Sequence, residues 1–99
     1  MTGCTGTPRW MAPEVFKGEN YNISSDIYSL GMIISYVTTE KLPFRHFSTI
    51  RFNQFMHGDE EIRVDAPKKY RYVVHQCVQR KANLRPDVEA VYYHLAGTQ

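Results

Sequence analysis

The apolar positions of this 99-residue chain lie mainly in stretches that fit helices. Between residues 26 and 38 eight of the thirteen residues are large and apolar, which leaves almost no polar face, and no charge follows Asp26 until Glu40. A helix that is apolar all round is normally buried at the centre of a domain. Two short buried strands are the alternative, but the length of the run favours a helix. The pattern predicts a central buried helix over 26–38, capped by Ser24 or Ser25, with every face needed for some contact.

Shorter helices are predicted on both sides of this run. Pro13 in a first turn favours a helix over 13–16 that ends at the turn 18–20. Segments 48–56, 70–78 and 88–95 carry further apolar positions, which in the last two recur at helical spacing. These positions are Ile50, Phe52, Phe55 and Met56; Tyr70, Val73, Val74, Cys77 and Val78; and Val88, Val91, Tyr92 and Leu95. With no convincing strand, the chain is predicted to be all-α.

Composition narrows the class of protein. Hydrophobic residues make up 42% of the chain, which indicates a globular domain, or a piece of one, and not a disordered segment. The net charge is +2, and the densest basic cluster, 68–71, is more typical of a solvated helix start than of a nucleic-acid interface. No apolar run reaches the ~20 residues of a membrane-spanning helix. We therefore expect neither a nucleic-acid partner nor a membrane partner.

The cysteines and histidines point to no covalent or metal framework. Cys4 and Cys77 lie far apart, and the first residues of the sequence do not show the charged-then-apolar pattern of a signal peptide. They are therefore expected to be reduced thiols of a cytoplasmic protein. The four histidines are scattered singly, without the short spacing that zinc ligands need. No metal site is expected.

The most specific signal is the run Gly6-Thr7-Pro8-Arg9-Trp10-Met11-Ala12-Pro13-Glu14. It resembles the end of the activation segment of eukaryotic protein kinases, where Gly-Thr-x-x-Trp/Tyr leads into Ala-Pro-Glu. Three later stretches agree in order and spacing: Asp26-Ile27-Tyr28-Ser29-Leu30-Gly31, Leu42-Pro43-Phe44, and Cys77 followed by Arg85-Pro86. They resemble the start and end of the central helix of the kinase C-terminal lobe, and its Cys-x₇-Arg-Pro element. The resemblance implies that residues 1–97 form the later part of that lobe, with shorter helices around the central one.

The resemblance assigns structural roles to a few charged residues. Ala12 and Pro13 lead into Glu14, a carboxylate that would be costly to bury alone. In the family it pairs with the Arg of the Arg-Pro element, here Arg85, and two independent surface charges are the alternative. Asp26 in the family braces the catalytic loop. That loop is not in this sequence, so Asp26 is expected to act as a helix cap, while Gly31 completes its motif.

The same resemblance bears on substrate class. Gly6, Thr7 and Trp10 occupy substrate-positioning places, and Thr7 is typical of serine/threonine kinases. Trp10-Met11 favours the tyrosine-kinase-like branch of these enzymes. Thr2 and Thr5 stand where activation loops carry phosphorylation sites, with ordinary loop threonines as the alternative.

The groups that perform phosphoryl transfer in kinases do not occur in this sequence. It holds no G-x-G-x-x-G, no His-Arg-Asp and no Asp-Phe-Gly. No catalytic residue is therefore expected in this chain, and alone it should bind neither the ATP nor the Mg²⁺ of the parent family. The favoured hypothesis is a fragment of a serine/threonine kinase whose partners are protein substrates or the missing part of the domain. The alternative is a stand-alone interaction module that docks substrates through 6–14 and 48–56. Self-association is expected because the helix 26–38 has too little cover.

Overall fold

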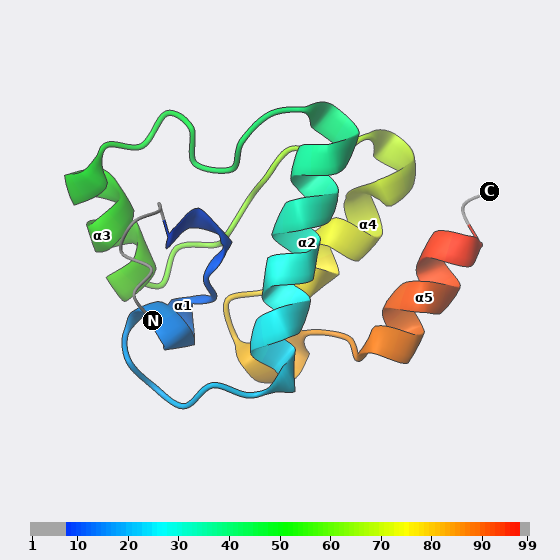
Figure 1. Ribbon diagram of the computed structural model, residues 1–99, viewed down its shortest axis with the longest axis horizontal. Coiled ribbons are helices and arrows are strands. Elements are labelled where there is room, and N and C mark those ends of the chain that lie inside the picture. The colour runs from blue at the N-terminus through cyan, green and yellow to red at the C-terminus, as the bar shows by residue number, and fades with distance from the viewer. Residues whose placement is uncertain (1–7, 98–99) are drawn as a thin grey trace.

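The computed structural model describes residues 8–97, and the helices are labelled in Figure 1. In chain order the elements are η2 (Pro8–Trp10), α1 (Pro13–Phe16), α2 (Ile23–Thr39), α3 (Thr49–His57), α4 (Lys68–Cys77), η3 (Ala82–Leu84) and α5 (Val88–Ala96). Residues 8–97 contain no strand, which confirms the all-α prediction and excludes paired strands within 26–38. Five residues singled out from the sequence lie outside the described part of the chain: Thr2, Cys4, Thr5, Gly6 and Thr7.

The long helix α2 begins earlier than its sequence suggests. Asn22 is its N-cap, with the side-chain oxygen accepting from the Ser24 backbone N–H at 2.9 Å. Ser25 completes a capping box, because its hydroxyl accepts from the Asn22 backbone N–H at 3.3 Å. The predicted caps, Ser24 and Ser25, are therefore wrong. Asp26 is not a cap either: it lies inside the first turn, where its carboxylate accepts a hydrogen bond from the Tyr21 hydroxyl.

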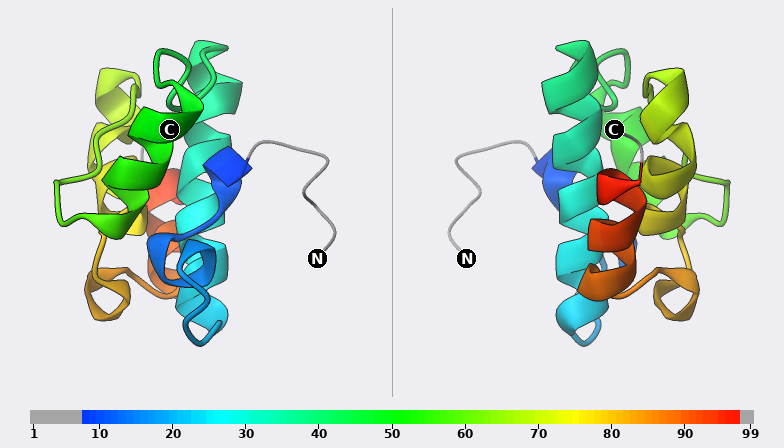
Figure 2. Two further views of the ribbon diagram at one scale, coloured as in Figure 1. Left: turned by 90° about the vertical axis from the view of Figure 1, so that its left-hand side faces the viewer. Right: turned by 90° about the vertical axis from the view of Figure 1, so that its right-hand side faces the viewer.

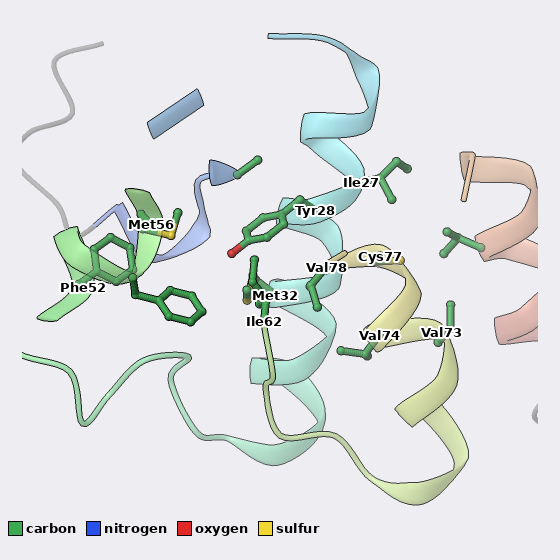
Figure 3. Close-up of a cluster of buried hydrophobic side chains, with 13 residues drawn as sticks. Ile27, Tyr28, Met32, Phe52, Met56, Ile62, Val73, Val74, Cys77 and Val78 are labelled. Carbon is green, nitrogen blue, oxygen red and sulfur yellow. The ribbon is translucent and has the colours of Figure 1, made fainter. Parts of the chain in front are cut away.

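Helix α2 runs through the middle of the molecule, with α3 and α5 at opposite ends of the long axis (Figures 1 and 2). α4 packs along it, and the stripe predicted for α4 is confirmed by its buried side chains Val73, Val74 and Cys77, followed by Val78. α2 contributes Ile27, Tyr28 and Met32 to the same core, as Figure 3 shows. Among residues 8–97, even α2 lacks the length and apolar character needed to cross a membrane.

Only one side of α2 is covered, although its sequence is apolar on nearly every face. Ile33 and Val37 are 47% and 67% exposed, in keeping with the expectation that this helix has too little cover within the chain. The two flanking helices depart from their predicted patterns. Ile50 on α3 is exposed, and on α5 the predicted stripe holds only for Val91 and the half-buried Leu95. Val88 and Tyr92, predicted to share that stripe, are exposed.

Candidate functional site

The segment 8–11 lies against α2 and the loop that follows it. Arg9 donates from Nη1 to the carbonyl of Pro43 at 2.9 Å. The Ser29 hydroxyl of α2 donates to the carbonyl of Trp10 at 2.6 Å. The Trp10 ring meets the Tyr36 ring edge to face, with centroids 5.9 Å apart. Both the backbone and the ring of Trp10 are therefore held in place just before Ala12 and the first α-helix.

Helix α1 presents Glu14 to the interior of the molecule. Ala12 and Pro13 are buried, and Pro13 occupies the start of α1, where its missing N–H leaves no helical bond unmade. Glu14 follows in the first turn, close to α2. Its Oε2 accepts from the Ser25 hydroxyl at 2.7 Å. The Ser residue of the α2 capping box thus also anchors α1.

The predicted pair between Glu14 and Arg85 is present. Arg85 donates from Nη1 to Oε2 at 2.7 Å and from Nη2 to Oε1 at 2.9 Å, which is the parallel, two-bond geometry of a guanidinium on a carboxylate. The Arg85 side chain is fully buried, and that of Glu14 is 14% exposed. The alternative of two independent surface charges is excluded.

Arg85 uses all of its donors. Nε donates to the Gln79 carbonyl at 2.8 Å, Nη1 also to the Ser24 carbonyl at 2.9 Å, and Nη2 also to the Arg80 carbonyl at 3.2 Å. Together with the two bonds to Glu14, these account for the five N–H groups of an arginine. The guanidinium carbon lies 5.1 Å from the centre of the Tyr28 ring. A buried cation with every donor satisfied joins α1, the start of α2 and the segment before η3.

The hydrogen bonds keep Glu14 ionised. Burial by itself raises the pKa of its carboxyl, but the bonds from Arg85 and Ser25 outweigh burial and hold the pKa below its usual value. Tyr28, buried beside this pair, has its pKa raised by burial, with its hydroxyl unpaired among residues 8–97. The charged pair is therefore the ground state at neutral pH.

Arg80 is a second anchoring arginine that the sequence did not reveal. It donates to three backbone carbonyls: from Nη2 to that of Phe55 at 2.8 Å, from Nη1 to that of Met56 at 3.2 Å and from Nε to that of Glu60 at 2.7 Å. These carbonyls lie at and beyond the C-terminal end of α3, where helix carbonyls lack intrahelical partners. Because Arg80 is 20 to 25 residues away along the chain, no local pattern could have indicated this role.

The carboxylates of residues 8–97 are not arranged to hold Mg²⁺ and a nucleotide. Asp26 accepts from Tyr21, Asp65 pairs with Arg45 at 2.9 Å, and Asp87 caps α5 through the Ala90 N–H at 2.8 Å. Within this range no three His, Cys, Asp or Glu side chains are grouped in a way that could bind a metal ion. The described residues therefore do not fit the Mg²⁺–ATP site that the resemblance implies for the parent family.

The remaining motif residues lie on α2 and its neighbours. Gly31 sits where α2 meets α4, next to Cys77 and Val78. Asp26, Glu14 and Arg85 lie around the N-terminal end of α2, whereas Trp10 contacts a later turn through Tyr36. The sequence motifs thus meet along one helix, although they are spread over most of the chain.

Comparison with known proteins agrees with this arrangement. The family described as protein kinase domain matches residues 1–95. This chain belongs to the protein kinase domain family. That assignment confirms the resemblance and explains why motifs distant in sequence converge on α2.

The curated relatives are protein kinases. A putative serine/threonine-protein kinase/receptor, R831, of Acanthamoeba polyphaga mimivirus is 35% identical over 96% of this chain and 6% of its own length. The dual specificity protein kinase shkD of Dictyostelium discoideum is 33% identical over 91% of the chain and 13% of its own length. Mitogen-activated protein kinase kinase kinase 7 of Bos taurus is 30% identical over 92% of this chain and 16% of its own length. The chain thus spans under a fifth of the length of these relatives.

Proposed function

We propose that this chain is the substrate-positioning part of the C-terminal lobe of a serine/threonine protein kinase, in the tyrosine-kinase-like branch. In this role the segment 6–14 receives the protein that accepts a phosphoryl group from ATP. The nucleotide, the metal ions and the catalytic base are held by other parts of the domain. The proposal rests on the family match and on relatives named as serine/threonine or dual specificity kinases.

The observation that carries the proposal is the two-bond ion pair between Glu14 and Arg85. It ties the end of the segment 8–14 to the body of the molecule, while Arg9 and Trp10 hold the beginning. A segment fixed at both ends can present a peptide in one orientation, which lowers the entropic cost of reaching the reactive geometry. Gly6 and Thr7 directly precede it and are proposed to face the acceptor hydroxyl.

A chimeric kinase tests this role. The 94-residue match in Dictyostelium shkD would be replaced by the corresponding residues of this chain, and phosphate transfer from radiolabelled ATP to Ser-, Thr- and Tyr-containing peptides measured. We expect transfer to Ser and Thr. A Thr7→Val chimera should lose most of the transfer while keeping the thermal midpoint of the parent chimera, because only a hydroxyl near the acceptor is removed.

Unaltered shkD is the positive control, and the isolated 99-residue chain is the negative control. The isolated chain should show neither phosphate transfer nor a thermal shift with Mg²⁺–ATP. A folded chimera that transfers no phosphate would contradict the proposal and favour a stand-alone interaction module. A Thr7→Val chimera with unchanged transfer would contradict the role given to Thr7.

A further inference from the structure

A groove of about 390 Å³ lies beside the segment 8–14 but is not formed by it. One wall is the loop 41–47, which follows α2, and the other is the segment 60–65, which precedes α4. The two regions are connected through Pro43, which lines the groove and accepts the hydrogen bond from Arg9. Anything bound in the groove would therefore lie next to the proposed substrate segment.

The floor of the groove is a rigid aromatic cluster. The rings of Phe44, Phe47 and Phe55 have centroids 5.3, 5.4 and 5.5 Å apart. Phe44 adopts a left-handed backbone conformation, with φ of 59°, which is strained for a bulky side chain. Contact of its ring with these two rings and with Phe52 holds it there. An apolar side chain of a ligand would thus meet a preformed surface.

Two ion pairs anchor the second wall, one to the loop 41–47 and one to α3. Arg45 of the first wall pairs with Asp65 of the second at 2.9 Å. Arg51 of α3 binds Glu60 through two bonds of 3.0 and 3.1 Å, with its guanidinium carbon 4.9 Å from the centre of the Phe47 ring. The Ser35 hydroxyl fixes the second wall by donating to the Asp65 carbonyl at 2.6 Å. These contacts connect the second wall to the loop 41–47, to α3 and to α2.

Among the lysines and arginines that line the groove, one has no carboxylate partner in the described part of the chain. The carboxylates that line it are each paired with an arginine: Asp65 with Arg45, Glu60 with Arg51, and Glu61 with Arg63 at 3.0 Å. Lys41 is exposed, and its ammonium group has no hydrogen-bond or ion-pair partner within residues 8–97. A ligand carboxylate would complement this charge without displacing an existing pair.

We propose that this groove docks a short acidic segment of a protein, with an apolar side chain on the Phe44–Phe47 floor and a neighbouring carboxylate on Lys41. The segment belongs to the protein substrate, so the inference rests on the proposed function and names a feature of the substrate class. Docking beside the segment 8–14 raises the local concentration of the acceptor hydroxyl without involving the reacting atoms.

Fluorescence anisotropy tests the docking with defined probes. A fluorescein-labelled peptide, Gly-Glu-Leu-Glu-Phe-Glu-Gly, and a counterpart with Lys in place of each Glu would be titrated with the 99-residue chain. The acidic peptide should bind saturably and the basic one should not. Lys41→Glu should weaken binding by about tenfold or more, because it replaces an attraction with a repulsion. Lys81→Glu is the matched control, since Lys81 is exposed but outside the groove, and should leave binding unchanged.

Circular dichroism would confirm that each variant is folded before titration. Equal binding of the two peptides, acidic-peptide binding that Lys41→Glu leaves intact, or no binding at about 1 mM would overturn the docking proposal. The acceptor peptides of the chimera experiment would carry no acidic docking segment, so its outcomes are separate from these. A chimera that is active while the groove fails to bind would overturn the docking proposal alone.

Discussion

Gly31 of α2 and Cys77 of α4 lie where these two helices are in close contact. A Cβ added to Gly31 would lie 2.6 Å from the Cβ of Cys77 and 2.8 Å from Cγ1 of Val78. Carbon atoms in proteins do not approach so closely, and a Cβ cannot move away without its backbone. The absence of a side chain at Gly31 thus lets α4 lie directly on α2, and Cys77 and Val78 are buried between them.

Gly31→Ala is expected to destabilise the fold. Alanine favours a helix over glycine by ~1 kcal/mol, but overpacking costs ~1–3 kcal/mol, so a net loss of up to ~2 kcal/mol is expected. The thermal midpoint, followed by circular dichroism, should fall. Val37→Ala, an exposed truncation on the same helix, is the control and should change stability by under ~0.5 kcal/mol. A raised midpoint for Gly31→Ala would mean that the two helices are not in close contact.

Removal of either partner of the Glu14–Arg85 pair should be severe. Each truncation leaves the other charge buried and uncompensated, at a cost of ~3–5 kcal/mol. For a domain of this size that is a large part of the whole stability, so Glu14→Ala and Arg85→Ala should lose soluble yield or unfold. Urea denaturation measures the effect. Arg63→Ala, which breaks the exposed pair with Glu61, is the control and should cost less than ~1 kcal/mol. Similar small losses for all three variants would contradict a buried pair.

Acid should weaken the same pair. The hydrogen bonds hold the pKa of Glu14 below its value in the unfolded chain, near 4.5. Its contribution to stability is therefore complete above that value and is lost as the pH falls through the lower pKa of the folded state. The free energy of unfolding, measured in urea from pH 6 down to pH 3, should decrease toward the acid end. In Glu14→Gln, if it folds, this decrease should be smaller, and an unchanged slope would assign the effect to other carboxyls.

Arg80 is expected to stabilise the end of α3 locally. Arg80→Ala would remove a charged donor from the carbonyls of Phe55, Met56 and Glu60, and Phe55 would keep the Gly58 N–H as its remaining donor. Losing hydrogen bonds to a charged group costs ~1.5–3 kcal/mol. Hydrogen exchange should accelerate over 52–60 more than over α4 and α5. Lys81→Ala, on the neighbouring exposed residue, should leave exchange in α3 unchanged. Uniform acceleration over the whole chain would show that Arg80 stabilises the fold without a local effect on α3.

The isolated chain is predicted to self-associate through the uncovered side of α2. Ile33 and Val37 line a hollow of about 370 Å³ together with Tyr70 of α4 and Leu95 of α5. Apolar surface of this kind, extended over three helices, favours association. Sedimentation at micromolar concentration should show species above 11.6 kDa. Because both side chains are exposed, Ile33→Lys with Val37→Lys should fold and shift the chain toward the monomer. A concentration-independent wild-type monomer would refute the prediction.

The sequence by itself determined the helices and the main ion pair. Dense apolar runs and helical spacing placed α2 and α4, because burial of an apolar face is a property of the local pattern. The kinase motifs predicted that Glu14 pairs with Arg85, 71 positions away along the chain. A buried carboxylate needs a partner, and in kinases this partner is the Arg of the Arg-Pro element.

Only the tertiary structure decided which groups meet across long distances and which faces stay open. Asn22, and not Ser24 or Ser25, is the cap of α2, while Ser25 takes part in the capping box and also donates to Glu14. The packing of the chain brings Arg80 to its carbonyl partners, and no pattern of residue spacing indicates these contacts. The face of α2 carrying Ile33 looks as apolar in sequence as its buried face. Hydrophobic pattern measures the tendency to be buried, whereas actual burial depends on which neighbours are present to cover a surface.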